Sequence, residues 1–158
     1  MNKKTLYTIY NLPIVYAEIG YEDTALIKVK QEHIKELIPK APYSGTLTIQ
    51  GTAAPVVNQL MEQRSVRGID FNVRSEDPWG THQNPSADVV VLYNVGSEVA
   101  MKGTVGGLVL ANIVKYYSNR RTLLVIETNM NKMELLHRYD FKATNFIKIE
   151  KKPEDVWI

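Results

Sequence analysis

The sequence contains no cysteine, which excludes disulfide bonds, thiolate metal ligands and a cysteine nucleophile. It also has little excess charge, because 19 Lys and Arg residues stand against 17 Asp and Glu residues, for a net charge of +2. A balance so close to zero is too weak to attract nucleic acid over the whole surface. There is no apolar run long enough to span a bilayer and no signal-peptide core. We therefore expect a soluble, cytoplasmic protein with no membrane partner.

Histidine is scarce as well. His33, His82 and His137 are scattered along the chain, without the spacing or the paired carboxylates of metal-binding motifs. We expect no metal site and no bound cofactor, with weak binding of a nucleotide or another anion left open.

From residue 45 onward, strand-like and helical segments alternate. Segments rich in β-branched and aliphatic residues predict five strands, at Gly45–Gly51, Ile69–Arg74, Asp88–Asn94, Thr122–Thr128 and Asn145–Glu150. Helical spacing predicts helices at Ala53–Arg64, Thr104–Arg121 and Asn131–Tyr139, the last with a capping-box start. The continuously apolar Asp88–Asn94 is typical of a strand buried on both faces. The pattern predicts a three-layer α/β domain with a mainly parallel, five-stranded sheet.

The first 44 residues have a different pattern. Leu6–Ile19 is strand-like and rich in tyrosine, whereas Lys30–Ile38 has helical spacing. We expect residues 1–44 to form an N-terminal strand and helix extension of a core domain at residues 45–158. The tyrosines suggest stacking on bases, although tyrosines in strands usually pack across the sheet.

A glycine at the end of the first predicted strand has the position of a phosphate-binding loop. In the pattern G-x-x-x-x-G-K-[ST], glycine amides wrap the phosphates, the lysine binds the outer phosphates and the hydroxyl binds magnesium. The corresponding residues here are Gly51-Thr-Ala-Ala-Pro-Val-Val-Asn58. Val56, Val57 and Asn58 replace the second glycine, the lysine and the hydroxyl residue. The loop therefore lacks the groups that make a P-loop catalytic.

The segments that follow this loop resemble those of P-loop ATPases of the AAA+ group, in the version found in helicase loaders. Asp88–Glu98 resembles their acidic strand, with Tyr93 and Asn94 in place of the two acids. Thr122–Asn129 resembles their sensor strand, with Asn129 at the sensor position. The resemblance is one of layout and covers roughly residues 45 to 152.

This resemblance implies a P-loop-like strand order and the remnant of a nucleotide site at Gly51, Thr52, Ala53, Asn58, Asn94 and Asn129. The lost lysine, hydroxyl and acids imply that hydrolysis of a magnesium nucleotide is lost as well. We therefore expect a non-hydrolysing protein without catalytic residues. It would bind a DNA replication or recombination protein, or its own copies.

A second resemblance leads to an alternative function. The succession of Pro13–Ile19, Gly45–Gly51 and Asp77-Pro78 is similar to small CRISPR-associated ring nucleases that cleave cyclic oligoadenylate. That family has an arginine near its Asp-Pro element, where this chain has Trp79, and only His82 lies nearby. The alternative is a small enzyme or binding module for a nucleotide-derived ligand.

Two features are candidates for partner contact. Trp79 lies in a polar loop, where a tryptophan either anchors the loop to the core or marks a contact surface. Lys115, Arg120 and Arg121 form a basic cluster suited to nucleic acid or to an acidic protein surface. Cations also gather at helix C-termini for structural reasons, and that reading is preferred for the cluster.

Overall fold

The computed structural model describes residues 2–19, 24–26, 44–75, 84–98 and 105–151. Its strands are β1 (Thr24–Leu26), β2 (Gly45–Gly51), β3 (Val66–Asp70), β4 (Val89–Val95), β5 (Leu123–Thr128) and β6 (Phe146–Lys151). Its helices are α1 (Lys3–Ile9), the 3-10 helix η1 (Ile14–Glu18), α3 (Ala54–Leu60), α4 (Phe71–Arg74), α5 (Val105–Ser118) and α6 (Lys132–Tyr139). The strand order is β1-β6-β2-β5-β4-β3. Strands β2 to β6 are parallel, and β1 pairs antiparallel with β6.

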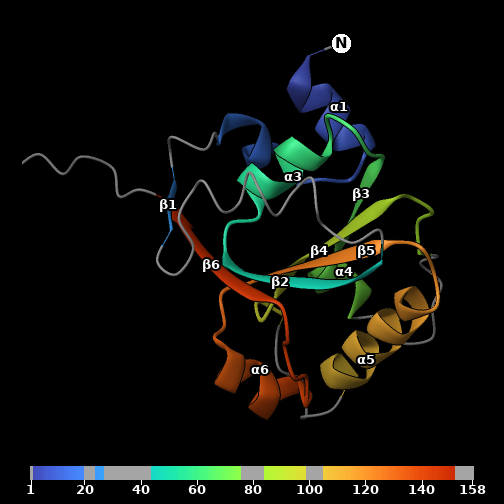
Figure 1. Cartoon of the computed structure of the whole chain (residues 1–158), viewed down its shortest axis with the longest axis vertical. Coiled ribbons are helices and arrows are strands. Elements are labelled where there is room, and N and C mark those ends of the chain that lie inside the picture. The colour runs from blue at the N-terminus through green and yellow to red at the C-terminus, as the bar shows by residue number, and fades with distance from the viewer. Residues whose placement is uncertain (1, 20–23, 27–43, 76–83, 99–104, 152–158) are drawn as a thin grey trace, which may run out of the picture.

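Helices cover both faces of this sheet, with α1, η1 and α3 on one face and α5 and α6 on the other (Figure 1). Successive side chains of a strand point to opposite faces, so a central strand supplies two cores. In β4, Val89 and Val91 join the core under α3, whereas Val90 and Leu92 join the core under α5. All four are fully buried. The predicted three-layer α/β fold is confirmed: the five expected strands are β2 to β6, all parallel, and the short antiparallel β1 adds a sixth strand.

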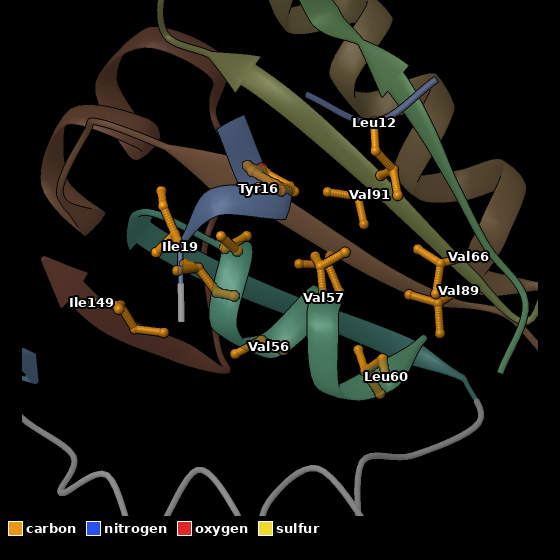
Figure 2. Close-up of a cluster of buried hydrophobic side chains, with 14 of the residues drawn as sticks. Leu12, Tyr16, Ile19, Val56, Val57, Leu60, Val66, Val89, Val91 and Ile149 are labelled. Carbon is orange, nitrogen blue, oxygen red and sulfur yellow. The ribbon is translucent and has the colours of Figure 1, made fainter. Parts of the chain in front are cut away.

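Residues 2–19, which we call the N-terminal strap, belong to the first of these cores. Figure 2 shows Leu12 reaching towards Val91, while Tyr16 and Ile19 lie above α3. Leu12, Tyr16 and Ile19 are each less than 7% exposed. The strap is therefore packed against the sheet and α3.

The strap is helical, so the strand expected over Leu6–Ile19 was wrong. Asn2 caps α1 by accepting a hydrogen bond from the Thr5 amide at 2.8 Å. Asn11, which follows α1, has a positive φ of 58°, and this backbone conformation separates α1 from η1. Tertiary packing of tyrosines against α3 here overrides their strand propensity. The helix expected at Lys30–Ile38 lies outside the described residues.

The second predicted strand exists, but its expected bounds were wrong. Strand β3 begins at Val66 and ends at Asp70, whereas the expected strand ran from Ile69 to Arg74. Asp70 ends the strand because its carboxylate accepts the Asn72 amide at 3.0 Å and caps the short helix α4. The other strands lie within one residue of the expected bounds, and the capping box at Asn131 and Glu134 is present.

The strand order creates a switch point at the carboxyl ends of β2 and β5, where α/β sheets have their ligand crevice. The connection after β2 runs through α3 on one face of the sheet, and the connection after β5 runs through α6 on the other (Figure 1). Neighbouring parallel strands whose connections leave on opposite faces define a switch point, the usual location of a ligand in α/β sheets.

Gly51 ends β2 at this switch point, and its backbone conformation determines how the chain turns into α3. Its φ is +109°, and a Cβ atom there would lie 1.8 Å from the Ile149 carbonyl oxygen of β6. We predict that Gly51→Ala lowers the free energy of unfolding by at least about 1–3 kcal/mol, the cost of the backbone conformation alone. Urea unfolding of Gly51→Ala and of Gly107→Ala measures this. A Cβ at Gly107 meets only ordinary contacts, so equal stability of the two variants would contradict the prediction.

Candidate functional site at the carboxyl ends of β2 and β5

A side chain from β5 reaches the start of α3. The Ala53 amide donates to Oε2 of Glu127 at 2.7 Å, and the Tyr16 hydroxyl donates to the same oxygen. Glu127 stands beside Ile49 in the β2–β5 register, two residues before the end of the β2 strand. The Ala53 amide, in the loop Gly51–Asn58, therefore already has an anionic acceptor from within the chain.

The loop's other groups are also engaged. The Thr52 amide donates to the Ile149 carbonyl at 3.0 Å, and the Thr52 hydroxyl accepts from the Ala54 amide at 3.2 Å. Ala53 is fully buried. Gly51, Thr52 and Ala53 thus form a tight turn whose contacts lie within the protein.

The positions that would carry the second glycine and the lysine lie in the core. Val56 and Val57 are 2% and 0% exposed and pack in the cluster formed by the strap, α3 and the sheet. Side chains at these positions therefore face the sheet rather than the crevice.

Asn58 ties α3 to the strap. Its Nδ2 donates to the carbonyls of Tyr16 and Ile19 at 2.9 Å each, and its Oδ1 accepts the Tyr7 hydroxyl at 2.5 Å. All of its side-chain polar atoms are therefore used in holding residues 2–19 in place.

The electrostatics of the crevice follow from burial. Burial raises the pKa of the Glu127 carboxyl above its ordinary value of 4.5, although the hydrogen bonds from Tyr16 and Ala53 act in the opposite direction. Burial, followed by the charge of Glu127, raises the pKa of Tyr16 well above 10, so that its hydroxyl remains a donor. Burial, then the charges of Asp70 and Glu127, raises the pKa of Tyr93 to about 12.

The end of β4 contacts different groups. Asn94 has a positive φ of 66°, and its Nδ2 donates to Asp70 at 3.0 Å. The Tyr93 hydroxyl donates to the Asn11 carbonyl of the strap at 3.0 Å. Where the resemblance places two acids, the chain therefore has a strand-end amide bound to a neighbouring carboxylate and a tyrosine bound to the strap.

The remaining candidates are spread over the molecule. Asn129 follows β5 and is exposed. Lys115, Arg120 and Arg121 are exposed at the end of α5, with the Arg120 guanidinium 3.5 Å from the Tyr116 ring centroid. This cluster precedes β5 and so lies at the amino ends of the strands, opposite the crevice. Trp79 lies outside the described residues.

Glu98 is a buried carboxylate with a structural set of partners. It accepts hydrogen bonds from the Tyr139 hydroxyl and from the Gly96 amide, and it pairs with Arg138 at 3.3 Å. These contacts join the loop after β4 to α6.

Sequence reasoning did not identify Glu127, Tyr16 or Asp70 as members of the site. The available signal was the acid in the otherwise apolar strand Leu123–Thr128, since an acid at a mostly buried strand position needs a partner. Among the described residues, no three His, Cys, Asp or Glu side chains gather as a metal site would require. None of the described helices combines the length and apolarity needed to cross a membrane.

No protein-family model matches the sequence. No curated protein matches it either. Solved structures do match the fold. A protein from Streptococcus pyogenes serotype M3, provisionally assigned as a primosome component, has a TM-score of 0.58 at 15% identity, over 97% of this chain and 100% of that one.

Two further structures come from replication proteins. DnaI has a TM-score of 0.53 at 15% identity, over 75% of this chain and 82% of its own. The replication initiator DnaA bound to AMPPCP and single-stranded DNA has a TM-score of 0.55 at 12% identity, over 84% of this chain and 50% of its own. The chain therefore shares its α/β fold with these three proteins.

The contacts of Glu127 predict different effects for two substitutions. Glu127→Ala leaves the Tyr16 hydroxyl and the Ala53 amide without their acceptor, at about 1–3 kcal/mol for each orphaned group. Glu127→Gln keeps an oxygen that accepts both bonds. We expect a loss of at least about 2 kcal/mol for alanine and less than about 1 kcal/mol for glutamine, measured by urea unfolding at pH 7. Equal losses would show that the two bonds are unimportant.

The raised pKa of Glu127 also predicts a pH dependence. A folded-state pKa above the unfolded value means that the folded protein binds the proton more tightly, so this contribution to stability is present below pH 4.5. It is lost as the pH rises through the folded-state pKa. The free energy of unfolding of the wild type minus that of Glu127→Gln should therefore decrease from pH 4 to pH 8. A difference that grows with pH would contradict the assignment.

Proposed function

We propose that this chain is a non-hydrolysing member of the P-loop replication fold that acts by binding another DNA replication or recombination protein, or its own copies. The first half of the proposal, that the chain does not hydrolyse nucleotides, is supported mainly by the hydrogen bond between the Ala53 amide and Glu127. In a P-loop the corresponding backbone amides wrap the phosphates of a nucleotide. Here the position is taken by a carboxylate of the same chain.

The replaced side chains support the same conclusion. Phosphoryl transfer depends on a lysine at the phosphates, on magnesium held by a hydroxyl, and on an acid near the metal. The chain has the buried Val57, the strap-binding Asn58 and the Tyr93–Asn94 pair at these places. Each replacement has an internal partner, so none is held ready for magnesium or phosphate.

The second half of the proposal rests on the fold. The S. pyogenes protein assigned as a primosome component shares this fold with DnaI and DnaA. A protein of this fold that does not hydrolyse nucleotide would act through its surfaces. The exposed basic cluster of Lys115, Arg120 and Arg121 offers a surface for an acidic partner or nucleic acid, held in shape by the stacking of Arg120 on Tyr116.

Nucleotide binding can be tested by thermal unfolding. A ligand present at 100 times its dissociation constant adds about 2.7 kcal/mol to stability. We expect no shift of the midpoint with millimolar ATP and magnesium, and no release of phosphate. Cyclic oligoadenylates form a separate arm, because a shift with them alone would favour the ring-nuclease-like alternative. A shift with ATP would overturn the first half of the proposal.

Partner binding requires its own experiment. The tagged chain is used to capture purified replicative helicase, primosome proteins and an untagged copy of itself, with Arg120→Glu/Arg121→Glu as the matched variant. We expect retention of at least one of these proteins. Retention of none, by a chain that is folded by circular dichroism, would overturn the second half.

A further inference from the structure

The turn at residues 119–121, which joins α5 to β5, has a backbone that is held on both sides. Before it, the Arg120 amide donates to the Tyr117 carbonyl at 3.1 Å. After it, the hydroxyl of the buried Thr122 donates to the Ala87 carbonyl at 3.0 Å. The turn that carries the two arginines of the basic cluster therefore has a fixed position at the amino ends of the strands.

The side chain of Arg120 is held in place as well. Its guanidinium lies 3.5 Å from the centroid of the Tyr116 ring, and its Nη1 donates to the Tyr116 carbonyl at 2.9 Å. The Tyr116 ring packs at nearly a right angle against the ring of the buried Tyr117, with the two centroids 4.9 Å apart. The Tyr117 hydroxyl in turn donates to the Pro85 carbonyl at 3.1 Å. Because these contacts already restrict its rotamers, Arg120 loses less conformational freedom when it binds a partner.

The positive charge of the basic cluster is not neutralised within the described part of the chain. Lys115, Arg120 and Arg121 are exposed, and no described acid forms an ion pair with them. Asp88, just before the neighbouring strand β4, directs its carboxylate to the Ser65 amide at 3.2 Å instead. The cluster thus has three uncompensated charges in a chain whose net charge is +2.

The free donors of the cluster match carboxylates. Since Nη1 of Arg120 is used within α5, its Nε and Nη2 remain, and no described group accepts from them. Two neighbouring donors of a planar guanidinium fit the two oxygens of one carboxylate. Arginine and tyrosine are also the residues that most often contribute strongly to binding at protein interfaces.

The size of the cluster favours a protein partner over nucleic acid. Proteins that hold DNA by charge make about 6–10 phosphate contacts. The cluster has only Lys115, Arg120 and Arg121, which match the few carboxylates of a short acidic segment. Capping of α5 explains the bond of Arg120 to the Tyr116 carbonyl. It does not explain the two other cations, which contact no described side chain.

We propose that the basic cluster is the docking site for an acidic segment of the partner protein. One carboxylate of that segment binds the free edge of the Arg120 guanidinium, and further carboxylates pair with Lys115 and Arg121. This inference deepens the partner-binding half of the proposed function and rests on it, because it names the chemistry of the partner.

The test uses the full chain and a fluorescent peptide of alternating glutamate and serine, with binding measured by anisotropy. Lys115→Glu/Arg121→Glu replaces two attractions by two repulsions and removes no contact within the described protein. We expect this variant to bind the peptide about tenfold more weakly than the wild type. Arg120→Lys keeps the charge but loses the planar edge, so we expect about threefold weaker binding.

The matched control changes the net charge equally but away from the cluster. Lys3 and Lys142 are exposed and have no described ion pair, so Lys3→Glu/Lys142→Glu should bind the peptide as the wild type does. Added salt should weaken the binding by the wild type, because exposed charges are screened. Circular dichroism confirms that each variant is folded.

The proposal is overturned if the wild type does not bind the acidic peptide, or if the two double variants lose affinity equally. Tighter binding of a single-stranded oligothymidylate than of the peptide would also overturn it, because the cluster would then serve nucleic acid. An unchanged affinity of Arg120→Lys would remove the assigned role of its guanidinium. If Lys115→Glu/Arg121→Glu still captures the protein that the wild type retains, the docking site falls while the proposed function stands.

Discussion

The bond of Glu127 to Ala53 and Tyr16 connects the three parts of this molecule. It joins β5 to the turn before α3, and it joins both to the strap. A carboxylate in a partly buried place is unfavourable unless donors surround it, and these two donors offset part of that cost. Both donors need the carboxylate in turn, because the Ala53 amide and the Tyr16 hydroxyl are buried. These two hydrogen bonds therefore add a polar connection to the apolar packing of the strap against α3.

The layers could be predicted from sequence because they depend on burial, whereas the strand order was implied by the resemblance to P-loop ATPases. The run Val89–Leu92 is apolar on both faces and has to lie between two helical layers, and the structure places it there. Helix α6 could be located by its capping box, a local signal complete within Asn131 and Glu134. Such features need no knowledge of distant residues.

The site and the strap could not be predicted in this way because their causes lie far apart in the sequence. Tyr16 is 111 residues from Glu127, and Gly68 is 57 residues from Asn11. Nothing near Tyr16 distinguishes a tyrosine that donates to a buried carboxylate from one that stacks on a base. At β3, the alternation of apolar and polar residues continues past Asp70, but the carboxylate of Asp70 binds the Asn72 amide and ends the strand. The alternation of apolar and polar residues does not predict that hydrogen bond.

The residues at the positions of the P-loop pattern form a consistent set in physical terms. A lysine at residue 57 would bring an ammonium group into a fully buried position, whereas Val57 adds apolar contact there. Asn58, at the position of the metal-binding hydroxyl in the P-loop pattern, accepts one hydrogen bond and donates two, all of them with the strap. A nucleotide would stabilise such a crevice only while it is bound. The strap, in contrast, is part of the same chain, so its groups are always present at a high effective concentration set by the covalent connection. The strap therefore gives this crevice the internal contacts that, on the proposed function, make a bound nucleotide unnecessary for its stability.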